Sequence, residues 1–508
     1  MLSILNCENS LCVKMSKSFL SDIGLGFFIS PNEYYLVEKF ITSDRKTIEK
    51  RQALFTAIFQ DNALVSFFSS LQENIKNMNE CKDNASKITS NKESEETLFY
   101  SFREFIFFTD SIDLICDKLL GTTNSDLREL FEKAKSVQQS DWYNNAQKYV
   151  NEMNEKLHDI KSVTIGMNLN AQLSPIEAGI ISINTEPCVT NSLFDKLFSS
   201  KINDKSLICI SPLGLQESKI PNESLVALNV NLYHSLNEIM KGSLKKIKEV
   251  LHTQFVKASE FLFELSDEIE FIDICNNYIL SMMAKGMPLC NPTINKRQHI
   301  SSLYNSELTT YKKKNEIVAN DVFFDDNGKL FVLAGANSGG KSVYLRSVGI
   351  AQVLFQLGLP ITAKKAEMMV FNEMCSCFRN NINDKRSGSF ENECKVVSDL
   401  CRDISEKSLI LLDEVFSTTS SYDAYVIAQK IIEYFSRMGC CLIYATHIHE
   451  LVESASLVNA NTNAKSKVDF LSAEYIDNQR SYKIMRRKCD YGSAAMDIFE
   501  KYSMEFLL

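Results

Sequence analysis

The stretch GANSGGKS, residues 335–342, follows the apolar run LFVLA at residues 330–334 and precedes a helical pattern over residues 343–357. Glycines at such a junction let backbone amides converge on phosphate oxygens, and the helix N-terminus adds the positive end of its dipole. The lysine supplies a cation for the β- and γ-phosphates, and the last serine supplies a hydroxyl for Mg²⁺. The stretch therefore predicts a P-loop for ATP and Mg²⁺, formed by Gly335, Ala336, Asn337, Ser338, Gly339, Gly340, Lys341 and Ser342.

Paired carboxylates end a second apolar run. The sequence LILLDE at residues 409–414 ends in Asp413 and Glu414, about 70 residues after the P-loop. A carboxylate in the position of Asp413 holds Mg²⁺ in P-loop enzymes. The adjacent Glu414 is placed to orient or deprotonate an attacking water, which is general-base work. The pair predicts hydrolysis of ATP and argues against a kinase for small molecules.

A histidine follows a third apolar run. Ala445, Thr446 and His447 come directly after CCLIY at residues 440–444. Ligands of parallel sheets bind at the carboxyl ends of the strands, so His447 is expected at the same edge as the P-loop. It is a candidate to hydrogen-bond the γ-phosphate or the attacking water.

The spacing of these runs predicts the fold of the C-terminal part. Short apolar runs at residues 331–334, 409–412 and 441–444 alternate with helical patterns at 343–357 and 424–437. Strands that alternate with helices indicate an α/β domain with a mostly parallel sheet. A change in style near residue 310, at the basic stretch TYKKKNE, marks the expected boundary.

The first 310 residues have a different character. Apolar residues at helical spacing predict helices from about 41 to 160, and alternation predicts a β-hairpin near 163–185 with its turn at Ser174 and Pro175. Residues 236–272 keep one apolar face, which predicts a helix of about 50 Å or a helix pair with a tight break. The polar stretch 77–96 is expected to be a surface loop or a frayed helical connection.

Composition excludes several classes of protein. The 508 residues suggest about three domains. The net charge of −9 and the pI of 5.5 disfavour a wholly basic DNA-coating protein, although local basic patches stay possible. The 15 scattered cysteines form no pair of Cys-x-x-Cys knuckles and suggest a reducing cytosol, hence a cytoplasmic protein. No apolar run reaches 18 residues, so we predict no membrane span, and the N-terminus lacks the regions of a signal peptide.

A fourth block, KRSGSFENE at residues 385–393, is weaker alone. A turn of small residues followed by a helix can bind an anion, but an ordinary loop with a helix cap gives the same pattern.

Together and in this order, the four blocks resemble the MutS family of DNA mismatch-repair ATPases, within the ABC-type superfamily. The resemblance covers about 310–495 through GANSGGKSVYLRSVG, LILLDEVFSTTSSYDA, ATHIHEL and IVANDVFF. A looser one begins near residue 41, where ITSDRKTIEKRQALF is similar to the start of the family's core and lever region. The implied organisation is an N-terminal segment 1–40, a helical lever and clamp region 41–310 with the β-rich insert near 163–185, and an ABC-type ATPase domain 311–508.

The resemblance implies a composite site and partners. Asp413 and Ser342 would hold Mg²⁺, Glu414 and His447 would act in catalysis, and the P-loop would bind ATP. Ser387, Ser389 and Glu393 of a second subunit would close over the γ-phosphate, which implies a homodimer through the ATPase domain. The helical region would transmit this motion to DNA.

The sequence also departs from the family. Only 40 residues precede residue 41, so we expect a short member without the mismatch-reading and connector domains. The triplet Phe102-Arg103-Glu104 matches a mismatch-reading pattern, but it lies in a helical apolar stripe and is interpreted as core packing. Gly388 and Ser389 stand where the family commonly has Ser-Thr.

Two functions from different classes stay open at this point. One is a DNA-binding ATPase of repair or recombination that acts on mismatched, branched or otherwise structured DNA. The other is an ATP-driven protein-interaction switch, favoured by the acidic pI and the missing reader domain.

Overall fold

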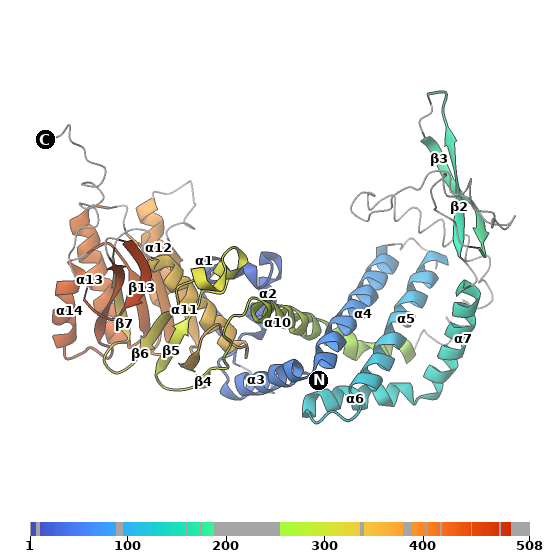
Figure 1. Cartoon of the computed structure of the whole chain (residues 1–508), viewed down its shortest axis with the longest axis horizontal. Helices are drawn as coiled ribbons and strands as arrows, with labels where there is room; N and C mark the ends of the chain where they lie inside the picture. Colours follow the sequence, from blue (N-terminus) through green and yellow to red (C-terminus); the bar gives the residue numbers. More distant parts are fainter. Residues whose placement is uncertain are drawn as a thin grey trace. The chain divides into compact units, whose positions relative to one another are not determined.

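The computed structural model describes residues 2–6, 11–87, 95–158, 161–172, 175–186, 254–335, 340–378, 389–402, 404–416, 419–448, 450–476 and 479–488. The chain divides into two compact units, whose elements Figure 1 labels. Residues 66–269, with the first two residues, form the helical unit. Residues 3–65 and 270–508 form the second unit, which we call the sheet unit. These boundaries differ from those expected at 41 and 310.

The helical unit is built from long amphipathic helices. Its elements are α4 (Asn62–Lys87), which begins in the sheet unit, α5 (Glu95–Lys118), α6 (Ser125–Gln138) and α7 (Asp141–His158), with a further helical stretch at 254–264. Their apolar stripes form the core: the rings of Phe105 and Phe108 lie 5.4 and 5.2 Å from that of Phe255. Phe102 is buried in the same stripe, as predicted for core packing.

Two expectations for this unit are corrected or refined. The stretch 77–96 is no loop as far as Lys87, because α4 continues to that residue and α5 begins at Glu95. The expected long helix is interrupted by a turn at Leu265, after which α10 (Ser266–Ala284) begins. Residues 236–253 of that prediction lie outside the described residues.

The predicted hairpin is confirmed. β2 (Ser162–Leu169) and β3 (Pro175–Asn184) pair antiparallel, with two register shifts along their length. Its side chains leave apolar surface uncovered, since Ile181 is largely exposed.

The centre of the sheet unit is a seven-stranded sheet in the order β1-β9-β10-β11-β7-β12-β13. The neighbouring pairs are parallel except β12 with β13, which confirms the predicted mostly parallel sheet. The strands are β1 (Lys14–Met15), β7 (Leu330–Ala334), β9 (Glu373–Phe378), β10 (Ser408–Asp413), β11 (Cys441–Ala445), β12 (Val468–Ile476) and β13 (Gln479–Met485).

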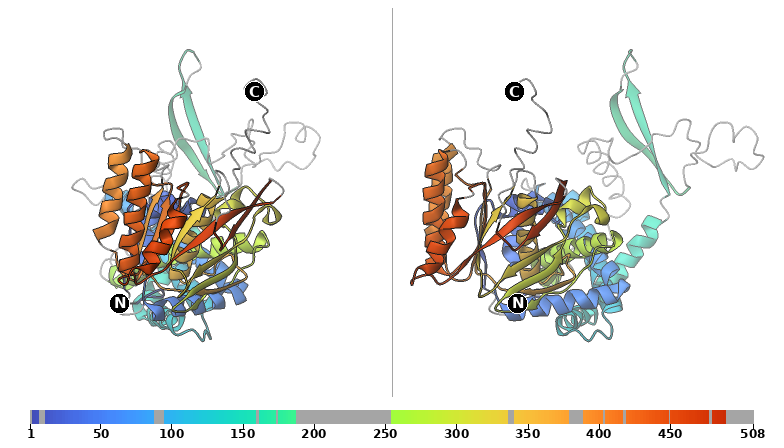
Figure 2. Two further views of the ribbon diagram at one scale, coloured as in Figure 1. Left: turned by 90° about the vertical axis from the view of Figure 1, so that its left-hand side faces the viewer. Right: turned by 60° about the vertical axis from the view of Figure 1, so that its left-hand side comes forward.

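Helices cover this sheet on both faces. α12 (Ser389–Arg402), α13 (Ser421–Met438) and α14 (Leu451–Ala460) pack on one face in a common apolar core with Ile410, Leu412 and Tyr444 (Figure 2). α11 (Lys341–Gln356) packs on the other face, where Gly349 allows close approach: a Cβ there would lie 3.2 Å from Leu411 Cδ1.

A smaller sheet adjoins α11. Its order is β4-β8-β5-β6, and its strands are β4 (Thr293–Ile294), β8 (Lys365–Met368), β5 (Gln298–Leu303) and β6 (Asn320–Phe324). The short helices η4 (Glu307–Thr310) and η5 (Lys314–Glu316) connect β5 to β6.

Residues 3–65 join the rest of the sheet unit through buried polar contacts. Their elements are β1, α1 (Phe19–Asp22), η1 (Leu25–Phe27), η2 (Pro31–Glu33), α2 (Tyr34–Phe40) and α3 (Arg45–Gln60). Gln356 on α11 donates to the Thr42 carbonyl at 3.0 Å, and Ser376 on β9 donates to the buried Asp22 carboxylate at 2.6 Å. These contacts explain why the segment expected to stand apart at 1–40 belongs to the sheet unit.

No described helix has both the length and the apolar character that a membrane crossing requires.

Candidate active site

Three strand ends bring the predicted residues to one edge of the sheet. Asp413 ends β10 and is in register with Ala445 at the end of β11, which is in register with Leu333 near the end of β7. The P-loop follows β7, Glu414 follows β10, and His447 follows β11 by two residues. The shared edge predicted from the three apolar runs is therefore present.

The two ends of the P-loop have backbone conformations that require glycine. Gly335 has φ +142°, and a Cβ there would lie 2.8 Å from the Cβ of Ala473. Gly340 has φ +93° and caps α11. The left-handed region is costly for residues with a side chain, so glycine fixes the entry into the helix. Ala336, Asn337, Ser338 and Gly339 lie outside the described residues.

Lys341 is buried at the start of α11, with 4% of its surface exposed. Its ammonium donates to the Gly335 carbonyl at 2.8 Å and lies 4.0 Å from Glu414 Oε1. A buried cation needs partners, and here one partner is the loop that would surround the phosphates. The Lys341 ammonium is thus held beside the first residue of the predicted P-loop.

Asp413 and Ser342 form the pair expected to hold Mg²⁺. Asp413 Oδ1 is buried and finds no hydrogen-bond partner among the described residues. Burial raises the pKa of Asp413 above its ordinary value, and the nearby Ser342 hydroxyl opposes this rise. A buried oxygen without a donor suits a cation, and carboxylate with hydroxyl oxygen suits Mg²⁺ in a site completed by phosphates and water.

A carboxylate and a hydroxyl alone do not enclose a cation, so a metal ion held by this pair would need further ligands from phosphates and water. Across the described part of the chain, no group of three or more His, Cys, Asp or Glu side chains is placed to hold a metal ion.

Glu414, His447 and Lys341 form a connected polar row. His447 Nε2 lies 2.5 Å from Glu414 Oε1, and His447 Nδ1 lies 3.5 Å from Lys341 Nζ. Since an ammonium only donates, the Nδ1 facing it accepts, and the Nε2–H then donates to Glu414. The carboxylate that would act on water is oriented by an imidazole that is itself oriented by the P-loop lysine.

The backbone around Glu414 is strained. Glu414 has φ +54° and Phe416 has φ +66°, a region that residues with a side chain rarely adopt. Such conformations persist only where the surroundings hold them, and they cluster at functional sites. The Glu414 amide donates to the Ala445 carbonyl at 2.9 Å, and the Tyr444 hydroxyl donates to the Val415 carbonyl at 2.9 Å.

The fourth block is placed only in part. α12 begins at Ser389, as the predicted turn-then-helix requires, but Ser387 and the side chain of Ser389 lie outside what the structure describes. Glu393 is turned inward, with 1% of its surface exposed, and accepts a hydrogen bond from the Phe416 amide at 2.5 Å. In this chain the Glu393 carboxylate therefore contacts the segment after Glu414, and its expected role at the site of a second subunit stays a prediction.

Comparison with known proteins agrees with this geometry. Residues 331–497 match the family model of MutS domain V. The resemblance drawn from the four motif blocks is thereby confirmed for this region.

The similar proteins are DNA mismatch repair proteins MutS. One from Prochlorococcus marinus (strain MIT 9312) is 36% identical over 154 residues, 30% of this chain and 16% of the relative. One from Prochlorococcus marinus (strain MIT 9301) is 29% identical over 238 residues, 46% of this chain and 25% of the relative. One from Macrococcus caseolyticus is 24% identical over 352 residues, 67% of this chain and 38% of the relative. The matches thus span well under half of each relative's own length.

The structure adds residues to this site that sequence patterns did not single out. A cavity of about 410 Å³ opens beside Gly340 and Lys341, and its lining includes Asn305, Tyr311 and Tyr482. Tyr482 is 47% exposed, and its Cδ1 would lie 3.6 Å from a Cβ at Gly340. It reaches the P-loop from β13, about 140 residues along the chain, so no local pattern could reveal it.

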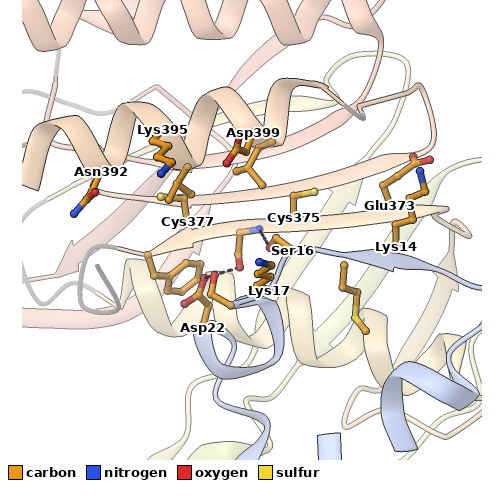
Figure 3. A pocket seen from close by; sticks show the side chains of 16 residues that line it. Lys14, Ser16, Lys17, Asp22, Glu373, Cys375, Cys377, Asn392, Lys395 and Asp399 are labelled. Carbon is orange, nitrogen blue, oxygen red and sulfur yellow. Dashed lines mark hydrogen bonds between the residues drawn. The ribbon is translucent and has the colours of Figure 1, made fainter. Parts of the chain in front are cut away.

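A second cavity of about 740 Å³ lies along α12, between that helix and the N-terminal segment. Figure 3 shows Asn392, Lys395 and Asp399 of α12 on one side, with Ser16 and Asp22 on the other. Thus one long face of α12 borders open space, while the opposite face packs in the core of the MutS domain.

Proposed function

We propose that this chain is a MutS-type ATPase that binds ATP with Mg²⁺ and uses binding and hydrolysis to clamp and release DNA. The observation that carries the proposal is the convergence of Lys341, Glu414 and His447 beside the Asp413–Ser342 pair. This is the set of groups that phosphoryl transfer to water needs: a cation for the phosphates, metal ligands, and a base held by a partner.

The residues divide the work as follows. Lys341 and the amides at the start of α11 would bind the β- and γ-phosphates. Glu414 would accept a proton from the water whose oxygen attacks the γ-phosphorus, while the bond to the β-phosphate oxygen breaks. His447 would keep the carboxylate aimed at that water, because its Nε2 already lies 2.5 Å from Glu414 Oε1. When bound through Asp413 and Ser342, Mg²⁺ would supply positive charge against the phosphate oxygens.

The base of the nucleotide has a candidate place. The cavity of about 410 Å³ begins at Gly340, where the phosphates would lie, and Tyr482 offers an exposed ring at its edge. A tyrosine ring gives flat apolar area for stacking. We assign this cavity to the adenosine part of ATP.

The proposal extends to assembly and to DNA by analogy with MutS. The segment that includes Ser387 and Ser389 would close over the γ-phosphate of a second copy, which gives a homodimer. The helical unit would act as the lever and the β2–β3 hairpin as part of the clamp on DNA. The described cysteines are all free, which fits the reducing conditions of the cytoplasm.

The test combines one variant with a DNA series. In Glu414→Gln we expect ATP affinity to stay within about threefold while hydrolysis falls by roughly 10²–10³-fold, since general-base catalysis contributes on this scale. Rapid-quench assays and equilibrium binding of labelled ATP measure the two quantities. Turnover at the wild-type rate would refute the assignment of Glu414.

Gel shifts on duplex, mismatched and branched DNA, with and without ATP, test the partner. Binding that changes with ATP and with DNA structure supports the clamp. An active ATPase that ignores every DNA would instead favour the protein-interaction switch, for which the net charge of −9 is the supporting observation.

A further inference from the structure

Glu393 lies on α12, far from the P-loop in sequence, yet it contacts the segment that carries the proposed base. Its carboxylate accepts the Phe416 amide at 2.5 Å, and Phe416 is two residues after Glu414. We propose that Glu393 is a positioning residue that ties the position of α12 to the position of the Glu414 carboxylate. This inference rests on the proposed ATPase function and adds a control over its catalytic step.

The hydrogen bond acts on a backbone that would not hold its shape alone. Glu414 and Phe416 both have positive φ values, and Val415 lies between them. Three bonds from outside the segment hold this turn: the Glu414 amide donates to the Ala445 carbonyl, Tyr444 donates to the Val415 carbonyl, and the Phe416 amide donates to Glu393. Without an acceptor for the Phe416 amide, the turn can relax toward negative φ, and the Glu414 side chain turns with it.

A second contact joins the same two segments. The rings of Phe390 on α12 and Phe416 lie 6.0 Å apart at an interplanar angle of 65°, an edge-to-face arrangement. Phe390 and Glu393 are three residues apart and so share one face of the helix. One face of α12 therefore contacts Phe416 twice: Glu393 accepts from the Phe416 amide, and Phe390 packs against the Phe416 ring.

The other long face of α12 is free to move. Asn392, Lys395 and Asp399 line the cavity of about 740 Å³ between α12 and the N-terminal segment (Figure 3). A helix packed on one face and bordered by a cavity on the other can shift into that space with little steric cost. Such a shift would pull on Phe416 and thus move Glu414 away from its 2.5 Å contact with His447.

The experiment is a double-mutant cycle on single-turnover ATP hydrolysis. Glu393→Ala should lower the rate of the chemical step by about 10- to 100-fold while ATP affinity changes less than about threefold, because only transition-state positioning is lost. Glu393→Gln should keep the rate within about threefold, since its amide oxygen still accepts the Phe416 amide. Glu391→Ala, at an exposed position of the same helix, is the matched control and should behave as wild type.

The combination with Glu414→Gln decides between positioning and general destabilisation. If Glu393 acts through Glu414, Glu393→Ala/Glu414→Gln is no slower than Glu414→Gln alone, because residues that work as a unit are not additive. Multiplied losses would overturn the proposal, as would a Glu393→Ala rate equal to wild type.

A further variant covers a folding failure. Should Glu393→Ala not fold, Phe390→Leu in the same cycle removes the ring contact and leaves the hydrogen bond; the same non-additivity is expected, and multiplied losses refute the proposal. A wild-type chain without ATPase activity would instead refute the proposed function itself, so the two failures are distinguishable.

Discussion

Among the residues that the structure describes, two cations of the sheet unit are buried, and their surroundings differ. Lys341 is 4% exposed and Arg51 is fully buried. Arg51 donates to the carbonyl of Leu5 at 2.7 Å, to Asn6 Oδ1 at 2.9 Å and to the carbonyl of Phe40. Lys341 has a carbonyl partner at one side and faces Glu414, His447 and a cavity at the other.

The difference shows how to distinguish a buried charge that binds a ligand from a buried charge that only stabilises the fold, which we call a support. The acceptors around Arg51 come from two segments, residues 5–6 and Phe40 at the end of α2, so its charge joins the N-terminal segment to α3 and serves the fold. Lys341 lies among groups that also titrate or accept protons, on the edge of the sheet where ligands bind. Burial of charge alone does not mark an active site; what matters is whether the neighbours can act on a ligand.

The substitution Lys341→Ala tests this distinction with the largest expected effect. We expect ATP affinity and hydrolysis to fall by about 100-fold or more, because a buried cation aimed at phosphate is lost. The melting temperature without nucleotide should stay near the wild-type value. Isothermal titration with ATP and thermal unfolding by circular dichroism measure the two effects.

The matched control is Lys365→Ala, whose side chain is 80% exposed and pairs only with Glu367 at 3.7 Å. It should change neither quantity. If Lys341→Ala instead unfolded the protein at unchanged ATP affinity in the folded fraction, Lys341 would be a support like Arg51.

The sequence predicted Lys341 and its edge because every cue was local. Each cue lies within a few residues of the apolar strand that it follows: the glycines at 335 and 340 come after β7, and the carboxylate of Glu414 comes directly after β10. Strand ends of a parallel sheet share an edge by construction, so a correct order of elements also placed Asp413, Glu414 and His447.

Contacts between distant segments stayed beyond reach of the sequence. Arg51 and Leu5 are 46 positions apart, and no pattern pairs a given arginine with a given carbonyl. The same holds for Tyr482, which reaches the P-loop from β13.

Glu393 is an intermediate case between these two. Its inward direction could have been read from the helix phase, since Phe390, Val397 and Leu400 on the same face are apolar. The resemblance to the MutS motif instead implied that Glu393 faces a second subunit.

The second test is Arg51→Met, which keeps apolar volume and removes the charge. The carbonyls of Leu5 and Phe40 lose their donors, so we expect the sheet unit to lose roughly 3–5 kcal/mol of unfolding free energy, the scale for breaking a buried charged network. Urea titrations followed by circular dichroism measure it, and ATP affinity of the folded protein should be unchanged.

Arg45→Met, at an exposed position of the same helix α3, is the control and should cost little. A loss below about 1 kcal/mol in Arg51→Met would show that the acceptors find water or new donors, and the assignment of Arg51 as a support would be wrong.

The smallest expected effect extends the comparison to a partly buried carboxyl, that of Glu104 in the helical unit. Burial raises the pKa of Glu104 from its ordinary value to about 7, and Lys82 only partly opposes this. A carboxyl with a raised folded-state pKa gives its full stability below its unfolded pKa of 4.5, and this stability is lost as pH rises through 7. The Glu104 carboxyl therefore stabilises the folded helical unit at low pH and destabilises it at high pH, unlike either cation.

Glu104→Gln should remove this destabilisation at high pH. Relative to wild type, we expect the helical unit to be more stable by about 1–3 kcal/mol at pH 8, with the difference shrinking toward pH 5. Trp142, the single tryptophan of the chain, lies in α7 of this unit, so its fluorescence in urea reports this unit's unfolding. Glu129→Gln, at an exposed position of α6, is the control. A difference that is independent of pH would mean that the substitution changes packing, and that the Glu104 carboxyl stays ionised in the folded helical unit.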